Sequence, residues 1–260
     1  MKTALITGAS SGIGEELARV FARNDTNLVL VARSERKLQD LSDELKRKYK
    51  VDIYIKPADL SNMDEVYKLA NDIKEAGIEI NFLVNNAGFG EFGFFHQINW
   101  ETDNNMIELN VKSLTYLTKY FLPDMVQRGE GRIMNVASTA AFQPGPLMAV
   151  YYATKAFVLS FSEAVANEVR DKGVTITAYC PGPTKSGFQE RANLEGSGLV
   201  EILNLATVEK VAEVGYKAMM KGKTVVVQGG VNALFVFFIR FMPRAWVRKA
   251  VRRISEKRHH

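Results

Sequence analysis

The sequence predicts an α/β fold: a single doubly wound parallel sheet of seven strands with helices on both faces. Short apolar runs rich in β-branched residues alternate with longer stretches of helical spacing, which is typical of βαβ units. A glycine-rich turn separates the first such run from the first helical stretch. The 260 residues, 47% of them hydrophobic, suit one large domain, and no linker or internal repeat divides them. Ligands of such sheets bind beyond the carboxyl ends of the strands.

Seven runs of four or five residues are predicted to form the strands. Parallel neighbours need crossover connections, and the intervals between most of these runs have room for helices. The predicted strands are Ala4–Thr7, Leu28–Ala32, Asp52–Ile55, Phe82–Asn85, Arg132–Val136, Thr175–Tyr179 and Thr224–Val227.

Helical patterns occupy the intervals. Ser61 and Asn62, with Asp64 and Glu65 three residues later, resemble a capping box that opens the third helix. The other predicted helices are Glu15–Asn24, Ser34–Lys48, Glu101–Gln127, Tyr151–Asp171 and Val208–Met220.

A glycine-rich turn, Thr7-Gly8-Ala9-Ser10-Ser11-Gly12-Ile13-Gly14, follows the first strand and opens a helix. Glycine permits a tight turn and close backbone approach, and a helix N-terminus presents unpaired N–H groups to a phosphate. In an alternating chain this position predicts nucleotide binding, although three residues rather than one separate the first two glycines. The residues predicted to contact the cofactor here are Gly8, Ser10, Ser11, Gly12, Ile13 and Gly14.

The end of the second strand indicates which nucleotide is bound. An NAD site usually places an acid there to bond the ribose 2′-hydroxyl, whereas arginine accommodates the 2′-phosphate of NADP. Here Arg33 follows the strand, while Asp25 precedes it and Glu35 comes later. We therefore predict NADP(H), with Arg33 on the 2′-phosphate and Ser34 and Lys37 assisting it.

Residues after the later strands extend the predicted cofactor site. Asp59, followed by Leu60, is a candidate acceptor for an adenine amino group, and the small residues of Asn86-Ala87-Gly88 would let a nucleotide pass close to the backbone. Both segments are equally consistent with a cap or a tight turn. The sixth strand leads to Pro181-Gly182-Pro183-Thr184, whose prolines force an irregular path, and Thr184 is a candidate to bond the nicotinamide amide.

Tyr151 and Lys155 are four residues apart on a predicted helix and therefore share one face, with Ser138 thirteen residues upstream of Tyr151. A nearby ammonium favours the phenolate and lowers a tyrosine pKa from its usual ~10, so Tyr151 is a candidate general acid/base. Tyr152 lies three residues before Lys155, and spacing alone does not separate the two phenols.

Taken together, TGASSGIG, NNAG, a later Asn110, Ser138, YYATK and PGPT, in this order, resemble the short-chain dehydrogenase/reductase family over nearly the whole chain up to about Gly230. The resemblance implies a Rossmann-like domain over residues 1–230 that transfers hydride between nicotinamide and a carbonyl or alcohol carbon. It also implies a catalytic set. These residues are Ser138, Tyr151, Lys155 and Asn110.

The family pattern assigns a role to each of them. Tyr151, four residues before the lysine, would exchange the hydroxyl proton, and Ser138 would bond the substrate oxygen. Lys155 would lower the phenol pKa and hold the nicotinamide ribose, while Asn110 would hold a water. Two readings compete with this enzyme: an NADP(H) sensor without chemistry, and a membrane-associated scaffold.

Apolar residues beside the predicted centre suit a lipophilic substrate or, equally, anchor their loops to the core. The resemblance places a mobile lid over Lys185–Leu205. The apolar residues in question are Phe89, Phe92, Phe94, Phe95, Phe142, Leu147 and Met148.

The basic charge is concentrated in the tail. Residues 240–260 contain eight Lys or Arg and one acid, and the remaining 26 basic and 28 acidic residues leave the body nearly neutral, which argues against a nucleic-acid partner. Val231–Met242 is apolar but too short to span a bilayer of ~30 Å. Beyond Pro243, one helical face carries apolar residues and the other basic ones. The apolar face comprises Trp246, Val247, Ala250, Val251 and Ile254.

Such an extension, residues 231–260, is expected to pack on its own domain or on a second subunit more readily than on an anionic membrane. Met1-Lys2-Thr3 leaves no room for a signal peptide, and the lone Cys180 excludes an intrachain disulfide, so the cytoplasm or a membrane surface facing it is the expected location. A homo-oligomer is also expected. His259 and His260 are not interpreted as metal ligands, and no metal site is predicted.

Overall fold

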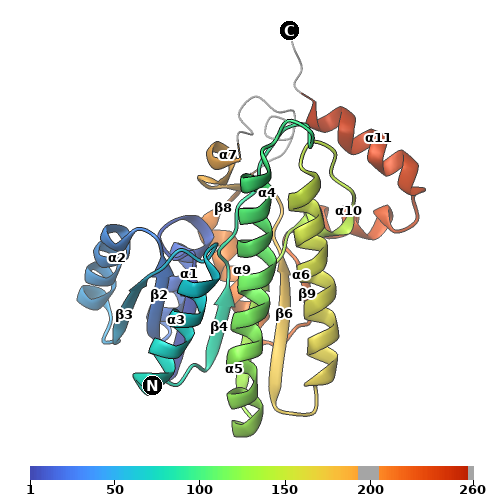
Figure 1. Cartoon of the computed structure of the whole chain (residues 1–260). Coiled ribbons are helices and arrows are strands. Elements are labelled where there is room, and N and C mark those ends of the chain that lie inside the picture. The colour runs from blue at the N-terminus through green and yellow to red at the C-terminus, as the bar shows by residue number, and fades with distance from the viewer. Residues whose placement is uncertain (193–204, 257–260) are drawn as a thin grey trace.

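The computed structural model describes residues 1–192 and 205–256. Its main sheet has seven parallel strands in the order β3-β2-β1-β4-β5-β6-β9, as Figure 1 shows. The chain runs from the central β1 to one edge and then returns to continue on the other side of β1, which confirms the predicted doubly wound sheet. The strands are β1 (Thr3–Thr7), β2 (Asn27–Ala32), β3 (Ile53–Pro57), β4 (Phe82–Asn85), β5 (Gly131–Val136), β6 (Val174–Cys180) and β9 (Val225–Val227).

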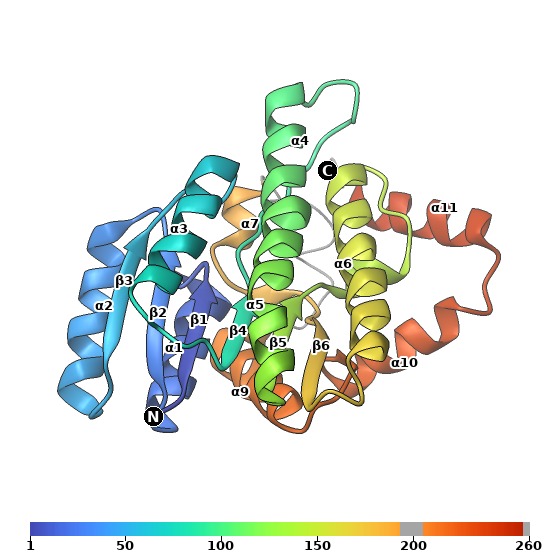
Figure 2. The same cartoon turned by 60° about the horizontal axis from the view of Figure 1, so that its bottom comes forward.

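Helices cover both faces of the sheet (Figure 1, Figure 2). On one face lie α1 (Gly12–Arg23), α2 (Glu35–Lys48) and α9 (Val208–Met220). On the other lie α3 (Met63–Glu75), α5 (Leu114–Arg128) and α6 (Ala149–Glu168).

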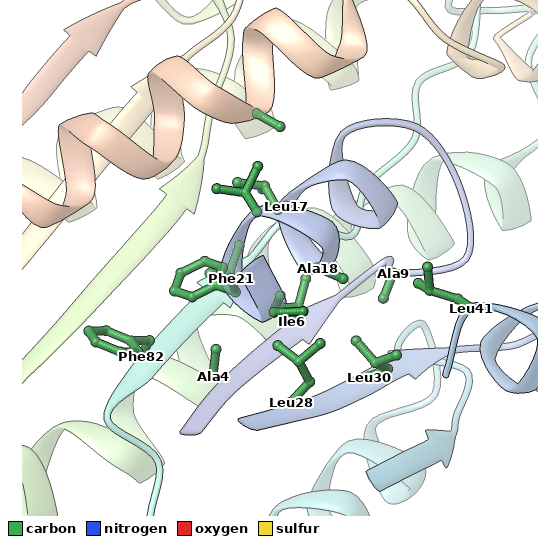
Figure 3. Packing of buried hydrophobic residues seen from close by; sticks show 14 of the residues in the cluster. Ala4, Ile6, Ala9, Leu17, Ala18, Phe21, Leu28, Leu30, Leu41 and Phe82 are labelled. Carbon is green, nitrogen blue, oxygen red and sulfur yellow. The ribbon is translucent and has the colours of Figure 1, made fainter. Parts of the chain in front are cut away.

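Alternation along β1 divides the core between these two layers. Figure 3 shows Ala4 and Ile6 on the side of α1, where Phe21 packs against Phe82 with ring centres 5.5 Å apart. Leu5 belongs to the cluster on the opposite face. All five residues of β1 are buried, which explains why the strand reads as a continuous apolar run.

The long helix predicted roughly over Glu101–Gln127 is confirmed as an uninterrupted helical run, but its winding is not uniform. It consists of α4 (Trp100–Ile107), a π-helical turn η1 (Glu108–Ser113) and α5. The wider π turn contains Asn110, whose side chain bonds backbone outside the helix. Such turns are frequent at functional sites, and residue periodicity does not reveal them.

The predicted capping box at α3 forms only in part. Asn62 caps the helix by accepting from the Asp64 N–H at 3.0 Å. Glu65, however, accepts from the Asp59 N–H at 2.7 Å rather than from the cap residue. Its carboxylate therefore stabilises the turn that follows β3.

Beyond β6 the chain forms a second, two-stranded sheet that the sequence did not predict, in which β7 (Thr184–Lys185) pairs with β8 (Ala206–Thr207). The short helix α7 (Phe188–Arg191) follows β7. Residues 193–204 of the predicted lid lie outside the described residues.

The C-terminal extension consists of α10 (Gly230–Ile239) and α11 (Arg244–Ser255). The predicted apolar face of α11 is only partly covered, because Val247 and Val251 are buried whereas Trp246 and Ile254 are exposed. Within the described residues, no helix combines the length and the apolar character needed to cross a membrane.

Candidate active site

The glycine-rich turn forms a cradle at the carboxyl end of β1. Gly8 and Gly12 have φ values of 69° and 60°, which side-chain-bearing residues rarely adopt. A Cβ on Gly14 would overlap the Gly8 carbonyl oxygen and the Asn86 amide. Glycine is therefore required at these three positions for the turn that leads into α1.

Thr7 joins this turn to the segment after β4. Its Oγ1 accepts from the N–H groups of Asn86 and Ala87, both at 3.0 Å, and donates to the Val84 carbonyl at 3.3 Å. The Asn86 side chain donates to the Thr7 carbonyl at 2.9 Å. Asn86 thus holds the two loops together, and Thr7 is a structural residue of the site that the sequence analysis missed.

Arg33 lies at the end of β2 with 72% of its side chain exposed, 3.9 Å from the Asp59 carboxylate. Ser34 is the N-cap residue of α2 but makes no side-chain cap bond. Lys37 is exposed on the first turn of α2. Two cations and a helix N-terminus are therefore gathered at one point, an arrangement suited to a phosphate.

The two residues after β3 have structural partners of their own. One Asp59 oxygen accepts from the Ser61 N–H at 3.0 Å and the Ser61 hydroxyl at 2.7 Å. The Leu60 side chain is buried in the core, so Leu60 can offer a ligand only its backbone.

The side chains of Ser138 and Tyr151 lie next to each other, close enough for the serine to act on the phenol. Ser138 follows β5 and its Oγ also accepts from the Ala140 N–H at 3.1 Å, which fixes it at the start of the turn η2 (Thr139–Phe142). Burial raises the pKa of Tyr151 above its usual range, and the neighbouring Ser138 side chain opposes that shift only in part.

Lys155 is buried beside this pair. Its Nζ donates to the Val136 carbonyl at 2.8 Å and lies 5.8 Å from the centre of the Tyr151 ring. Burial lowers the pKa of Lys155 to about 8. The expected lowering of the Tyr151 pKa by this lysine is not found. Burial of the phenol dominates the shift, and the Lys155 ammonium donates to the Val136 carbonyl instead.

A pH dependence follows from this lysine. Lysine in an unfolded chain titrates near ~10.4, so the lower pKa of Lys155 opposes folding at neutral pH, and this opposition disappears between about pH 8 and pH 10.5. In the folded protein the ammonium needed at the site is lost around pH 8. We expect kcat/KM for NADPH to fall about tenfold per pH unit above about pH 8. A profile that stays flat to pH 10 would contradict this.

Tyr152 points elsewhere. Its side chain lies near Gln143, and its ring packs so closely on Gly145 that a Cβ there would overlap it. The ring centres of the two tyrosines are 6.0 Å apart at 76°. The structure therefore distinguishes the two phenols, which the sequence spacing does not. Tyr151 lies beside Ser138, whereas Tyr152 lies against Gly145.

Asn110 is fully buried in the π turn. Its amide donates to the Phe89 carbonyl at 2.9 Å and to Thr154 Oγ1 at 3.1 Å, while its oxygen accepts from the Phe89 N–H at 3.2 Å. A Cβ on the neighbouring Gly88 would lie 3.0 Å from that oxygen and 3.4 Å from Lys155 Nζ. Both amide hydrogens are used by protein partners, so Asn110 positions the loop that passes over Lys155.

We expect Asn110→Ala to lower the free energy of unfolding by about 1–3 kcal/mol, because it leaves the Phe89 backbone groups without partners. Urea denaturation measures this. Asn71→Ala removes an exposed bond with the Tyr120 hydroxyl and serves as the control, with a change below about 0.5 kcal/mol. Equal losses in the two variants would contradict the positioning role.

The segment after β6 is held from two sides. The Pro181 carbonyl accepts from the Thr139 N–H at 2.9 Å, and Thr184 is buried with its hydroxyl donating to the Gly182 carbonyl at 2.9 Å. A Cβ on Gly182 would overlap the Asn232 side chain of α10. The sequence pattern does not predict this contact between the C-terminal extension and the segment expected to bind nicotinamide.

The apolar residues predicted near the centre separate into groups. Phe92, Met148 and Phe188 cluster with Tyr151, and the Phe188 and Tyr151 ring centres are 5.3 Å apart. Phe142 packs into the core instead. Leu147 has a φ of 69°, and its carbonyl accepts from the Gly93 N–H at 2.9 Å. A bulky residue in this conformation is strained, and such strain often marks functional sites.

A family profile described as short chain dehydrogenase matches residues 2–196. The chain belongs to the short-chain dehydrogenase family. Its sheet order agrees with the resemblance noted in the sequence.

Two relatives cover about two thirds of the chain. Very-long-chain 3-oxoacyl-CoA reductase-B of Danio rerio is 39% identical over 185 residues, which are 69% of this chain and 58% of that protein. The 17-beta-hydroxysteroid dehydrogenase type 3 of Mus musculus is 38% identical over 182 residues, which are 68% and 58%. The chain thus matches little more than half the length of either relative.

Solved structures of similar fold extend over more of the chain. A short-chain dehydrogenase from Sphingobium yanoikuyae in complex with NADPH has a TM-score of 0.83 at 30% identity, covering 94% of this chain and 98% of that one. The bulky-bulky ketone specific alcohol dehydrogenase from Comamonas testosteroni has a TM-score of 0.79 at 28% identity, covering 100% and 97%.

Proposed function

We propose that the protein is an NADP(H)-dependent oxidoreductase that transfers hydride between nicotinamide and a lipophilic carbonyl or secondary alcohol. The observation that carries the proposal is the juxtaposition of the Ser138 and Tyr151 side chains with the buried Lys155, at the same edge of the sheet as the glycine cradle. Ser138 follows β5, and Tyr151 and Lys155 lie in the first two turns of α6, beyond the carboxyl ends of the strands where such sheets bind ligands.

The cradle fits a dinucleotide phosphate, because the positions that approach it most closely are glycines at which a Cβ would strain or block the turn. The bound cofactor supplies or accepts the hydride. The residues proposed to hold it are Gly8, Ser10, Ser11, Gly12, Ile13, Gly14, Arg33, Ser34, Lys37, Asp59, the Leu60 backbone, Asn86, Ala87, Gly88, Tyr151, Lys155, Pro181, Gly182 and Thr184.

The chain's own residues provide the proton chemistry. Because burial raises the pKa of Tyr151, its phenol stays protonated at neutral pH and is ready to donate to a carbonyl oxygen during reduction. Ser138 orients that oxygen and stabilises the negative charge that develops on it. Lys155, still largely protonated at neutral pH, adds positive charge at the site and is placed to bond a ribose hydroxyl.

The 2′-phosphate contact of Arg33 can be tested by substitution. We expect Arg33→Ala to raise the KM for NADPH roughly 10- to 100-fold and to leave the KM for NADH nearly unchanged, because a charge-assisted bond worth about 1.5–3 kcal/mol is lost. Arg36→Ala, on the exposed start of α2, is the matched control and should change neither value. An equal effect of Arg33→Ala on both cofactors would refute the NADP assignment.

The cluster of Phe92, Met148 and Phe188 around Tyr151 favours an apolar substrate. The names of the relatives, a 3-oxoacyl-CoA reductase and a hydroxysteroid dehydrogenase, are consistent with ketones on large apolar frameworks. We expect NADPH oxidation with bulky ketones or 3-oxoacyl thioesters. If NADPH binds but no ketone, aldehyde or thioester is turned over, a non-catalytic sensor is the better account.

We further propose that residues 1–230 form the catalytic domain, that residues 231–260 are an extension of it, and that the protein acts in the cytoplasm as a homo-oligomer. On α6, Phe157 is 41% exposed and stacks on Phe161 with ring centres 5.8 Å apart, an apolar feature suited to a second subunit. Light scattering of the purified chain gives the number of copies.

A further inference from the structure

We propose that α10 and α11 form a binding surface for anionic lipid bilayers, and that this surface holds the active site against the bilayer. The first observation is the number of large apolar side chains that the extension leaves in solvent. Within α10, Val236 and Ile239 are the buried residues, whereas most of its other apolar side chains are about half exposed or more. The exposed apolar residues of the extension are Val231, Leu234, Phe235, Phe237, Phe238, Phe241, Met242, Trp246 and Ile254.

These side chains adjoin one another. The Phe237 ring lies 5.6 Å from Phe238 and 5.3 Å from Phe241, both in edge-on contact. Phe241 and Trp246 are 73% and 65% exposed, on either side of the turn between the two helices. A contiguous apolar surface of this kind on a soluble domain marks an interaction site.

The basic charge of the extension indicates which kind of partner this surface binds. Between residues 240 and 256 there are six basic side chains and one acid, and the acid, Glu256, is bonded to Arg252 at 2.6 Å. Aromatic residues next to a group of cations match the interface of a bilayer that carries anionic headgroups. The basic residues are Arg240, Arg244, Arg248, Lys249, Arg252 and Arg253.

A second copy of the chain fits the same surface less well. In a two-fold dimer the patch would meet itself, so the basic residues around its apolar centre would face those of the partner. Like charges brought together in this way oppose association. An anionic bilayer meets the same cations with opposite charge.

The extension also touches the candidate active site on several sides. In α10, Asn232 lies against Gly182, and the helix packs against the turn η2 that follows Ser138. From α11, the Arg252 guanidinium lies 4.9 Å from the centre of the Phe94 ring, on the loop that also carries Phe92. A bilayer bound by these helices would lie next to the loops around Tyr151.

A bilayer in this position would extend the proposed function. The inference rests on the proposed function only for the nature of the substrate. An apolar ketone dissolved in the bilayer would reach the site without crossing water. Binding of the bilayer itself does not depend on catalysis and is measured separately.

The test is co-sedimentation of the full chain with vesicles of phosphatidylcholine alone or with 30% phosphatidylglycerol. We expect binding to the anionic vesicles that is at least tenfold stronger than to the neutral ones and weakens at 0.5 M NaCl. Phe238→Ser with Phe241→Ser, and separately Arg248→Glu with Lys249→Glu, should each lower partitioning at least tenfold, since each cation near the surface contributes roughly fivefold.

The matched control is Lys46→Glu with Arg47→Glu on α2, at the end of the molecule opposite α11 (Figure 1, Figure 2), which changes the net charge by the same amount. It should bind vesicles more strongly than the tail reversal does. No binding by the native chain, equal binding to neutral and anionic vesicles, or equal losses in the two charge reversals would each overturn the proposal. Loss of a dimer rather than of vesicle binding in the phenylalanine variant would assign the surface to a second copy.

Turnover separates this proposal from the proposed function. All variants should reduce a water-soluble ketone as the native chain does, while the tail variants alone should lose activity on a ketone carried in anionic vesicles. Vesicle binding without turnover of any ketone would refute the enzyme and leave the bilayer surface standing. Turnover without vesicle binding would do the reverse.

Discussion

Tyr151→Phe is expected to lower kcat for ketone reduction by about 10²- to 10⁴-fold and to leave NADPH affinity within about threefold. The substitution removes the phenol oxygen that lies beside Ser138 and keeps the ring that packs against Phe188. A positioned general acid contributes rate enhancements of this size. Stopped-flow measurement of NADPH oxidation and titration of NADPH fluorescence give the two quantities.

Tyr152→Phe is the control, because it deletes an identical oxygen from the adjacent residue. That oxygen lies near Gln143 rather than Ser138, so its loss should change stability by about 1 kcal/mol at most and leave most of kcat. If the two variants lose activity to a similar degree, the assignment of Tyr151 as the acid is wrong.

Gly14→Ala is expected to raise the Kd for NADPH at least about tenfold and to lower the melting temperature. The new Cβ would overlap the Gly8 carbonyl oxygen and the Asn86 amide, so the turn must move away from the geometry that a phosphate needs. Crowding of this kind typically costs about 1–3 kcal/mol. Isothermal titration with NADPH and thermal unfolding measure the effect.

Gly230→Ala provides the comparison for this substitution. It makes the same chemical change at the exposed start of α10, where no atom lies within 4 Å of a Cβ. Both the NADPH affinity and the melting temperature should stay near those of the native chain. Unchanged NADPH binding in Gly14→Ala would show that the cradle is not the phosphate site.

The sheet could be predicted because its strands are buried on both faces and therefore read as short apolar runs. The proximity of Ser138, Tyr151 and Lys155 could also be predicted, since Ser138 follows a strand and Tyr151 and Lys155 share a helix face. The contacts of Asn110 could not, because they depend on a π turn in which the residue register departs from helical periodicity.

Long-range contacts account for the other differences. Thr7 looks like the last residue of an apolar strand, yet its hydroxyl joins β1 to residues about eighty positions later. The pKa of Tyr151 depends on how deeply the ring is covered, which spacing along a helix does not reveal. The extension has an amphipathic pattern in sequence, but only the fold shows that Val247 and Val251 are covered while Trp246 is not.

The most direct test of the Ser138-Tyr151-Lys155 centre is transfer of deuterium from NADPH labelled at the nicotinamide C4 to a bulky ketone, followed by mass spectrometry of the alcohol. The native chain should yield an alcohol with one deuterium at the carbinol carbon, in one stereochemical sense. Tyr151→Phe should bind the labelled cofactor and yield almost none. Deuterated alcohol formed at similar rates by both proteins, or by neither in the presence of bound NADPH, would contradict the proposed mechanism.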